Sequence, residues 1–249
     1  MSMNNMLKIL FALGAPKTFY RFSTLMTPIL GVIAFLCLIC GWTWGLFFAP
    51  ADYQQGESVR IIYLHVPAAF LSLSIYAAMT IFASVVLIWR IKIAAILLKS
   101  SAQVGLVITL LALLTGSIWG KPTWGTFWVW DARLTGELIL FLIYAALLSL
   151  AYVLGNNEAS DRIVAIICWI GMLDLPIIHY SVQWWNTLHQ GSTLLMAKPK
   201  IHVSMLYPLL LSLFGMVCFC AWAVLSLSQA YLLRREYRQK WVSDFWRHA

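Results

Sequence analysis

Charged side chains are scarce in this sequence. Asp, Glu, Lys and Arg together make up 10% of its 249 residues, against about a quarter in a typical soluble domain. Hydrophobic residues reach 62%, so the composition excludes an ordinary soluble domain and predicts a membrane protein built of helices. In such a protein the net charge of +8 carries information on orientation in the bilayer and does not indicate nucleic-acid binding.

Motifs of common enzymes are missing as well. The sequence holds no Walker A motif, no H-E-x-x-H zinc motif and no Ser/His/Asp set, so it does not hydrolyse ATP by itself. Its cysteines lie inside apolar runs and none belongs to a C-x-x-C-H haem-attachment motif. We interpret them as small packing residues: Cys37, Cys40, Cys168, Cys218 and Cys220. These absences favour binding or transport over catalysis, and we expect no enzyme activity.

Six apolar runs are long enough to cross a bilayer: residues 25–48, 62–89, 101–119, 137–154, 163–179 and 203–228. They predict an all-α polytopic membrane protein in which residues 1–249 form a single membrane domain. Pro67 is expected in the first turn of the second helix, so that His65, two residues before it, is fixed at the mouth of that helix. Pro176 is expected to bend or end the fifth helix.

The positions of the basic residues predict the orientation. Twelve of the 17 Lys and Arg residues fall in the two terminal segments and in the loops after the second and fourth runs. By the positive-inside rule, both termini then lie in the cytoplasm, and residues 49–61, 119–136 and 180–202 lie on the outer face. In a bacterium this places a multi-pass protein in the inner membrane, with these segments facing the periplasm.

The second outer segment is rich in tryptophan. Four of them lie within twelve residues: Trp119, Trp124, Trp128 and Trp130. The glycines and the proline between them predict a shaped loop over residues 119–136 and not a continued helix. Large flat side chains on such a loop offer a surface for a large, flat, apolar ligand.

Charged residues accompany these tryptophans. Lys121 and Arg133 could meet carboxylates of a ligand. Asp131 and Arg133 could instead pair with each other. In the alternative interpretation, Asp131 fixes the loop by accepting backbone hydrogen bonds and Arg133 faces a ligand carboxylate. The sequence leaves both interpretations open.

Histidines gather on the same face. His65 and His189 are the expected ligand pair, because haem iron takes axial imidazoles and the two residues come from two outer segments on either side of the tryptophan run. His179 is expected to have a structural role, bonding a carbonyl that Pro176 leaves free. His202 is expected to be a plain interfacial residue, and His248 to be solvated in the C-terminal tail.

The run Trp119–Thr135, read as W-G-x-x-x-W-G-x-x-W-x-W-D-x-R-L-T, resembles the signature of the WWD family of haem-handling membrane proteins. Two further stretches, residues 49–67 and 176–191, extend the likeness. Length and span number resemble the branch of the family that serves cytochrome c maturation.

The resemblance implies that haem b is held at the outer face by the tryptophan-rich loop, with His65 and His189 as axial ligands. It implies association with the ATPase and membrane subunits of an ABC transporter and with a small single-span subunit. It also implies delivery of haem to a membrane-anchored periplasmic chaperone. Two alternatives are a haem lyase, which the longer, histidine-richer members of the family exemplify, and a haem permease, which requires a polar path through the spans.

Overall fold

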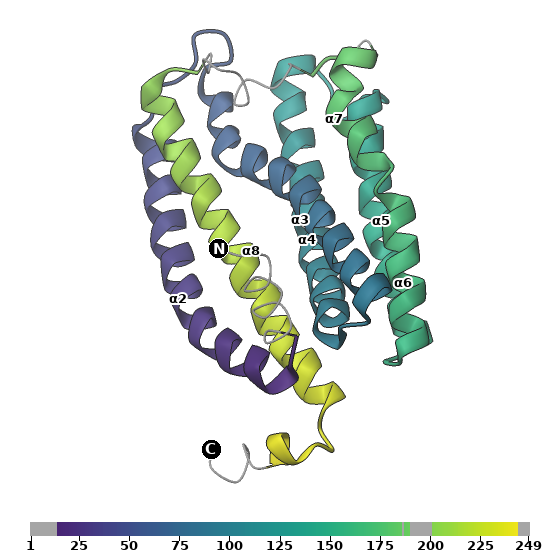
Figure 1. Cartoon of the computed structure of the whole chain (residues 1–249). Coiled ribbons are helices and arrows are strands. Elements are labelled where there is room, and N and C mark those ends of the chain that lie inside the picture. Colours follow the sequence, from purple (N-terminus) through teal and green to yellow (C-terminus); the bar gives the residue numbers. More distant parts are fainter. Residues whose placement is uncertain (1–13, 186, 190–200, 244–249) are drawn as a thin grey trace, which may run out of the picture.

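The protein is an all-helical bundle, seen in a computed structural model that describes residues 14–185, 187–189 and 201–243 (Figure 1). The elements are α2 (Pro16–Thr43), the π turn η1 (Trp44–Phe48), the 3-10 turn η2 (Glu57–Ile61), α3 (Ile62–Trp89), α4 (Lys92–Trp124), α5 (Ala132–Leu154), α6 (Glu158–Gly171), α7 (Asp174–Trp184) and α8 (Val203–Arg235). In these residues, six continuous or paired helices are long and apolar enough to cross a membrane, which confirms the predicted all-α membrane fold and the span number.

The helices extend beyond the apolar runs that predicted them. α2 begins at Pro16 and not near residue 25, and α4 begins at Lys92 and not near residue 101. Hydropathy marks the part of a helix that lies in hydrocarbon, whereas backbone hydrogen bonding continues through its polar turns. Pro16 is also a favoured first helical residue, because its missing N–H would have no partner there.

The tryptophan-rich segment contains a shorter loop than predicted. α4 continues through Pro122 to Trp124 and ends at Gly125, whose φ of +80° lies in the left-handed region that glycine adopts without strain. Asp131 then caps the start of α5. The loop expected over residues 119–136 is therefore confined to residues 125–131, with two tryptophans on α4 before it.

α3 begins where the second apolar run was predicted to begin, but Pro67 lies one turn deeper in the helix than expected. The helix begins at Ile62, so His65 lies in its first turn and Pro67 in the second. Proline has no N–H, and the carbonyl of Tyr63, four residues earlier, lacks its usual helical partner. The indole Nε1–H of Trp42 donates to that carbonyl at 3.3 Å. Pro67 thus leaves the Tyr63 carbonyl free to accept this hydrogen bond. The bond ties α2 to the end of α3 that carries His65.

The fifth span consists of two helices. α6 ends at Gly171 and α7 begins at Asp174, with a turn at Met172 and Leu173 between them. We expected Pro176 to bend or end this span; the interruption comes just before it. The chain then continues in helical form to Trp184, at the same end of the bundle as η2 and the end of α4 (Figure 1).

Packing divides the bundle into a pair and a larger group. α2 runs along α8, while α3 packs on α4; α6 packs on α3, α5 packs on α4, and α7 packs on α5 (Figure 1). α4 and α5 approach closely at Gly105, where a Cβ would lie 2.2 Å from the ring of Tyr144. The Tyr144 hydroxyl donates to the Ser72 carbonyl of α3 at 2.8 Å. These contacts hold α3, α4 and α5 in one register and so position the side chains at their ends.

A buried ionic cluster joins three helices at the opposite end of the bundle. Asp161 of α6 contacts Lys99 Nζ of α4 through Oδ1 at 2.8 Å and Arg235 Nη1 of α8 through Oδ2 at 2.8 Å. The Lys99 contact is ionic without hydrogen-bond alignment. We call these three residues the Asp161 cluster. Because all three side chains are at most 11% exposed, each charge depends on the others to remain inside the protein.

Candidate functional site

His65 is held at the start of α3 by the side of α4. Its Nδ1 lies 3.1 Å from the Ala112 carbonyl oxygen and 3.0 Å from Thr115 Oγ1. A carbonyl only accepts, so Nδ1 carries the proton and donates it. Gly116 of α4 leaves room for the ring, since a Cβ there would lie 2.9 Å from His65 Cε1. The Nε2 atom of His65 therefore keeps its lone pair.

His189 is held in the same manner by a carboxylate. Its Nδ1 lies 3.0 Å from Asp131 Oδ2. The Thr187 hydroxyl donates to the same oxygen and accepts the backbone N–H of His189 at 3.1 Å. A carboxylate only accepts, so Nδ1 again carries the proton and Nε2 is free to bind a metal. This arrangement of carboxylate, imidazole and free Nε2 is common around protein-bound metals.

The contacts of Asp131 bear on the alternatives that the sequence left open. Its Oδ1 accepts the backbone N–H of Leu134 at 2.8 Å and so caps α5. Among the described residues it makes no ion pair with Arg133. Asp131 therefore fixes the end of the loop and additionally orients His189, while the role of Arg133 in facing a ligand carboxylate stays a prediction.

The protonation states of this pair suit a metal ligand. Burial raises the pKa of the Asp131 carboxyl, but the hydrogen bonds from Thr187, Leu134 and His189 outweigh burial and bring that pKa below its ordinary value. Burial lowers the pKa of His189, and this outweighs the hydrogen bond to Asp131 and its charge, which raise it. At neutral pH, Asp131 is ionised and His189 is neutral, as metal binding requires.

Two of the four predicted tryptophans each contact one histidine. The Trp119 ring meets His65 nearly edge-on at a centroid distance of 5.6 Å, and its Nε1–H donates to Gln55 Oε1 at 2.8 Å. The Trp124 ring meets His189 at 4.7 Å with an interplanar angle of 66°. Both tryptophans come from the last turns of α4, so this helix links the two imidazoles.

The other two tryptophans lie on the loop. Trp128 and Trp130 contact each other at 5.4 Å with an interplanar angle of 78°. Trp130 is 75% exposed. The indole N–H of Trp128 is buried without a hydrogen-bond partner in the described part of the chain. This pair adds exposed aromatic surface to the loop that precedes Asp131, and it leaves one indole donor without a partner in the described residues.

The cations near the site divide in their roles. Lys121 donates to the Gly125 carbonyl at 3.0 Å and lies over the Phe127 ring, so its ammonium serves the loop. Arg133 forms no ion pair within the described residues, and its charge acts on both His65 and His189. Arg133 is therefore the better candidate to meet a ligand carboxylate.

The remaining histidines lie apart from this arrangement. His179 contacts the Tyr180 ring edge-on at 4.8 Å and does not bond the carbonyl that we expected Pro176 to free. That carbonyl, of Met172, accepts the N–H of Leu175 at 3.2 Å. His202 caps α8 by accepting the Ser204 N–H at 3.3 Å. The predictions on His248 and on residues 190–200 lie outside the described residues.

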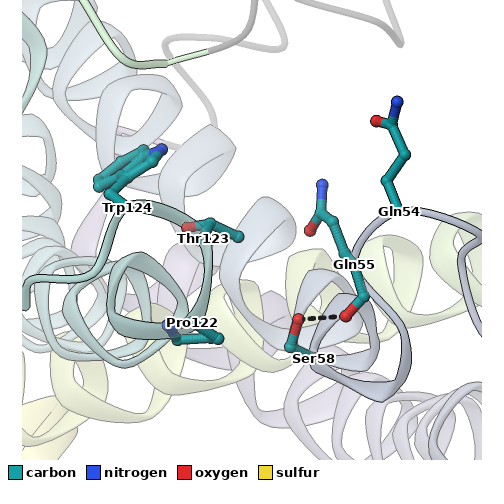
Figure 2. A pocket seen from close by; sticks show the side chains of 6 residues that line it. All are labelled: Gln54, Gln55, Ser58, Pro122, Thr123 and Trp124. Atoms are coloured by element: carbon teal, nitrogen blue, oxygen red, sulfur yellow. Dashed lines mark hydrogen bonds between the residues drawn. The ribbon is translucent and has the colours of Figure 1, made fainter.

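A cavity of about 330 Å³ adjoins the site. Figure 2 shows Gln54, Gln55 and Ser58 on one side and the end of α4, at Pro122, Thr123 and Trp124, on the other. Two of its lining residues contact the site directly, since Gln55 bonds Trp119 and Trp124 packs on His189. The cavity is open space beside Trp124, and its lining residue Gln55 connects it to Trp119.

Several residues of the site were not predicted from the sequence. Thr187 could have been found, because it precedes His189 by two residues and a hydroxyl at that spacing commonly bonds the local backbone. The partners of His65, Ala112 and Thr115, lie 47 and 50 residues away. Gln55 lies 64 residues from Trp119. A local sequence pattern cannot predict contacts between residues so far apart in the chain.

Known proteins resemble the chain over nearly its full length. The family model described as heme exporter protein C matches residues 9–243. Heme exporter protein C of Escherichia coli strain K12 is 46% identical over 239 residues, covering 96% of this chain and 97% of the relative. The protein of the same name from Haemophilus influenzae is 44% identical, covering 95% and 97%. That from Bradyrhizobium diazoefficiens is 39% identical, covering 92% and 87%.

Proposed function

Since the chain belongs to the heme exporter protein C family, we propose that it binds haem at the His65–His189 end of its bundle and passes it on during cytochrome c biogenesis. The proposal rests mainly on one observation, which is that the two imidazoles have the same tautomer and the same kind of surroundings. Each donates Nδ1–H to a fixed acceptor, each keeps Nε2 free, and each packs against a tryptophan of α4. Such a pair suits the two axial positions of haem iron.

The residues of the site divide the work of holding this cargo. His65 and His189 bind the iron through Nε2, with their orientation set by Ala112 and Asp131. Trp119 and Trp124 keep the imidazoles in place and supply apolar surface. Arg133 meets a haem carboxylate as a charge-assisted donor. Trp128 and Trp130 cover the exposed side of the site.

The role is presentation and delivery, with no catalytic step of its own. In our proposal the site faces the periplasm from the bacterial inner membrane, and the cargo is haem b. A membrane-anchored periplasmic chaperone receives the haem. The ATPase and membrane subunits of an ABC transporter, with a small single-span subunit, form the complex in which delivery is coupled to ATP hydrolysis.

The absorption spectrum of the purified protein tests this proposal. After haem has been supplied, we expect a low-spin spectrum typical of two imidazole ligands, in an amount close to one haem per chain. The pyridine haemochrome of the released group should be that of haem b. If the protein binds no haem under these conditions, the presentation role is wrong and the tryptophan-rich surface serves another purpose.

Replacing Asp131 by Asn should weaken haem binding about 10- to 100-fold, or about 1.4–2.8 kcal/mol. Asn caps a helix as well as Asp does, so α5 should keep its start while His189 loses its charged acceptor. A haem titration of the purified variant at pH 7.5 would measure the change. Asp52→Asn is the matched control, because Asp52 accepts the backbone N–H groups of Gln54 and Gln55 and touches neither histidine.

The proton affinity of His189 in the haem-free protein distinguishes lost orientation from lost folding. The Asp131 charge raises the pKa of His189, so its removal should lower that pKa. In NMR titrations of the haem-free proteins, His189 of the Asp131→Asn variant should therefore titrate at a lower pH than His189 of the parent. A His189 pKa that rises in the variant would contradict this account of the pair.

A further inference from the structure

A second cavity lies at the opposite end of the bundle from the histidines. It has a volume of about 270 Å³, and its polar lining consists of Arg90, Lys92, Arg162, Arg235, Glu158 and Asp161. These residues come from the α3–α4 turn, the start of α6 and the end of α8 (Figure 1). The site is thus formed between separate helices and does not belong to the haem site.

Two of the four cations are already paired. Arg235 binds Asp161, and Lys92 binds Glu236. Arg90 and Arg162 form no ion pair among the described residues, and both are exposed. The cavity therefore offers two free guanidinium groups. Guanidinium binds phosphate oxygens through two parallel hydrogen bonds, which favours a phosphate ligand over a simple anion.

The backbone at Arg90 is unusual. It is the one non-glycine residue with positive φ in the described part of the chain, at 54°. Its N–H donates to the Val86 carbonyl at 3.0 Å and so ends α3. Glycine adopts this conformation without strain, whereas other residues pay roughly 1 kcal/mol or more. The α3–α4 turn therefore contains a strained residue, and that residue places an arginine side chain at the cavity.

The depth of the cavity suggests the source of the phosphate. It lies where α3 ends at Trp89, α4 begins at Lys92, α6 begins at Glu158 and α8 ends at Arg235. Ends of membrane spans lie at the level of the lipid headgroups. Exposed aromatic residues are enriched at that level, and Trp89 is 49% and Tyr152 89% exposed. A phospholipid headgroup presents its phosphate at this depth, which favours a lipid as the source.

We propose that this cavity binds the phosphate of an anionic phospholipid headgroup, with Arg90 and Arg162 as the contacting cations. Basic pockets between helices near the membrane surface recognise such headgroups. The bound lipid would bridge the α3–α4 turn and α6, next to the Asp161 cluster that joins α6 to α4 and α8. The proposal does not depend on haem binding at the other end.

Lipid binding to the delipidated, detergent-purified protein tests this. Phosphatidylglycerol and phosphatidylcholine of identical acyl chains are titrated, with native mass spectrometry as the readout. We expect the parent to bind phosphatidylglycerol about tenfold more tightly. The double variant Arg90→Gln/Arg162→Gln should lose this preference. The control Arg21→Gln/Arg234→Gln removes two exposed cations that do not line the cavity, and it should keep the preference.

Three outcomes would overturn the proposal. The parent could show no preference between the two lipids, or the control could lose the preference together with the cavity variant. Inorganic phosphate at millimolar concentration could also abolish phosphatidylglycerol binding and raise the unfolding temperature as much as the lipid does, which would make the ligand a soluble phosphate. Helical content by circular dichroism shows that each variant is folded without reference to the haem site.

Discussion

Alanine at His65 or at His189 should abolish the low-spin spectrum of the haem-loaded protein, and the double variant should retain no haem above background. Loss of one imidazole leaves the iron with a single protein ligand, which gives a high-spin spectrum and at least a tenfold loss of retained haem. The effect should be comparable at both positions, because both rings have Nδ1 held and Nε2 free. Absorption spectra and haem-to-protein ratios of the purified variants measure it.

Imidazole added to the alanine variants distinguishes a lost ligand from a damaged fold. A small imidazole can occupy the space left by the side chain and restore the low-spin spectrum if the surroundings are intact. His179→Ala is the matched control, since His179 contacts only the neighbouring Tyr180 ring among the rings of the described residues and should leave the spectrum unchanged. An unchanged spectrum in both His65→Ala and His189→Ala would show that the ligands are misassigned, and His179 and His202 would be examined next.

Replacing Asp161 by Asn should destabilise the bundle by about 3–5 kcal/mol, the usual cost of leaving buried charges without their partner. Among the described residues, Asp161 is the one carboxylate in contact with both Lys99 and Arg235, and each of these side chains is at most 11% exposed. Without the Asp161 carboxylate, the charges of Lys99 and Arg235 repel each other in the buried interior of the bundle. Unfolding in detergent, followed by circular dichroism against added sodium dodecyl sulfate, measures the change.

Two further variants test whether the loss of stability comes from the unpaired buried charges. Glu158→Gln removes an exposed acidic residue one turn earlier on α6 and should change the free energy of unfolding by less than about 0.5 kcal/mol. The triple variant Lys99→Met/Asp161→Leu/Arg235→Met replaces the whole cluster by apolar side chains and should recover most of the lost stability. If Asp161→Asn is as stable as the parent, water reaches the Asp161 cluster and solvates the charges of Lys99 and Arg235.

The architecture could be predicted from the sequence because its physical cause is local. Each span is a long apolar run, and a bilayer accepts such a run only as a helix. The ends of the helices were missed because hydrogen bonding along the backbone does not stop where hydropathy does. α4 shows this at both ends, and its extension to Trp124 reshaped the predicted tryptophan loop.

The candidate site was predicted in its residue types but not in its contacts. The pattern of histidine and tryptophan identified His65 and His189, and their role as iron ligands stays a prediction. What the sequence could not provide was the pairing of Trp119 with one imidazole and of Trp124 with the other. That pairing depends on how α3, α4 and the segment after α7 meet. Close contacts between distant parts of the chain, such as Gly116 of α4 against His65 of α3, set this arrangement.

The two imidazoles are anchored with unequal firmness. His65 belongs to the first turn of a 28-residue helix, so it cannot withdraw without disturbing α3. His189 lies outside any helix, beyond the end of α7 at Trp184, and hydrogen bonds to Asp131 and Thr187 hold its ring and backbone. Breaking those bonds costs far less than unwinding a helix. We therefore expect haem to leave in a fixed order, first from His189 and then from His65, so that a recipient protein approaches the iron from the His189 side.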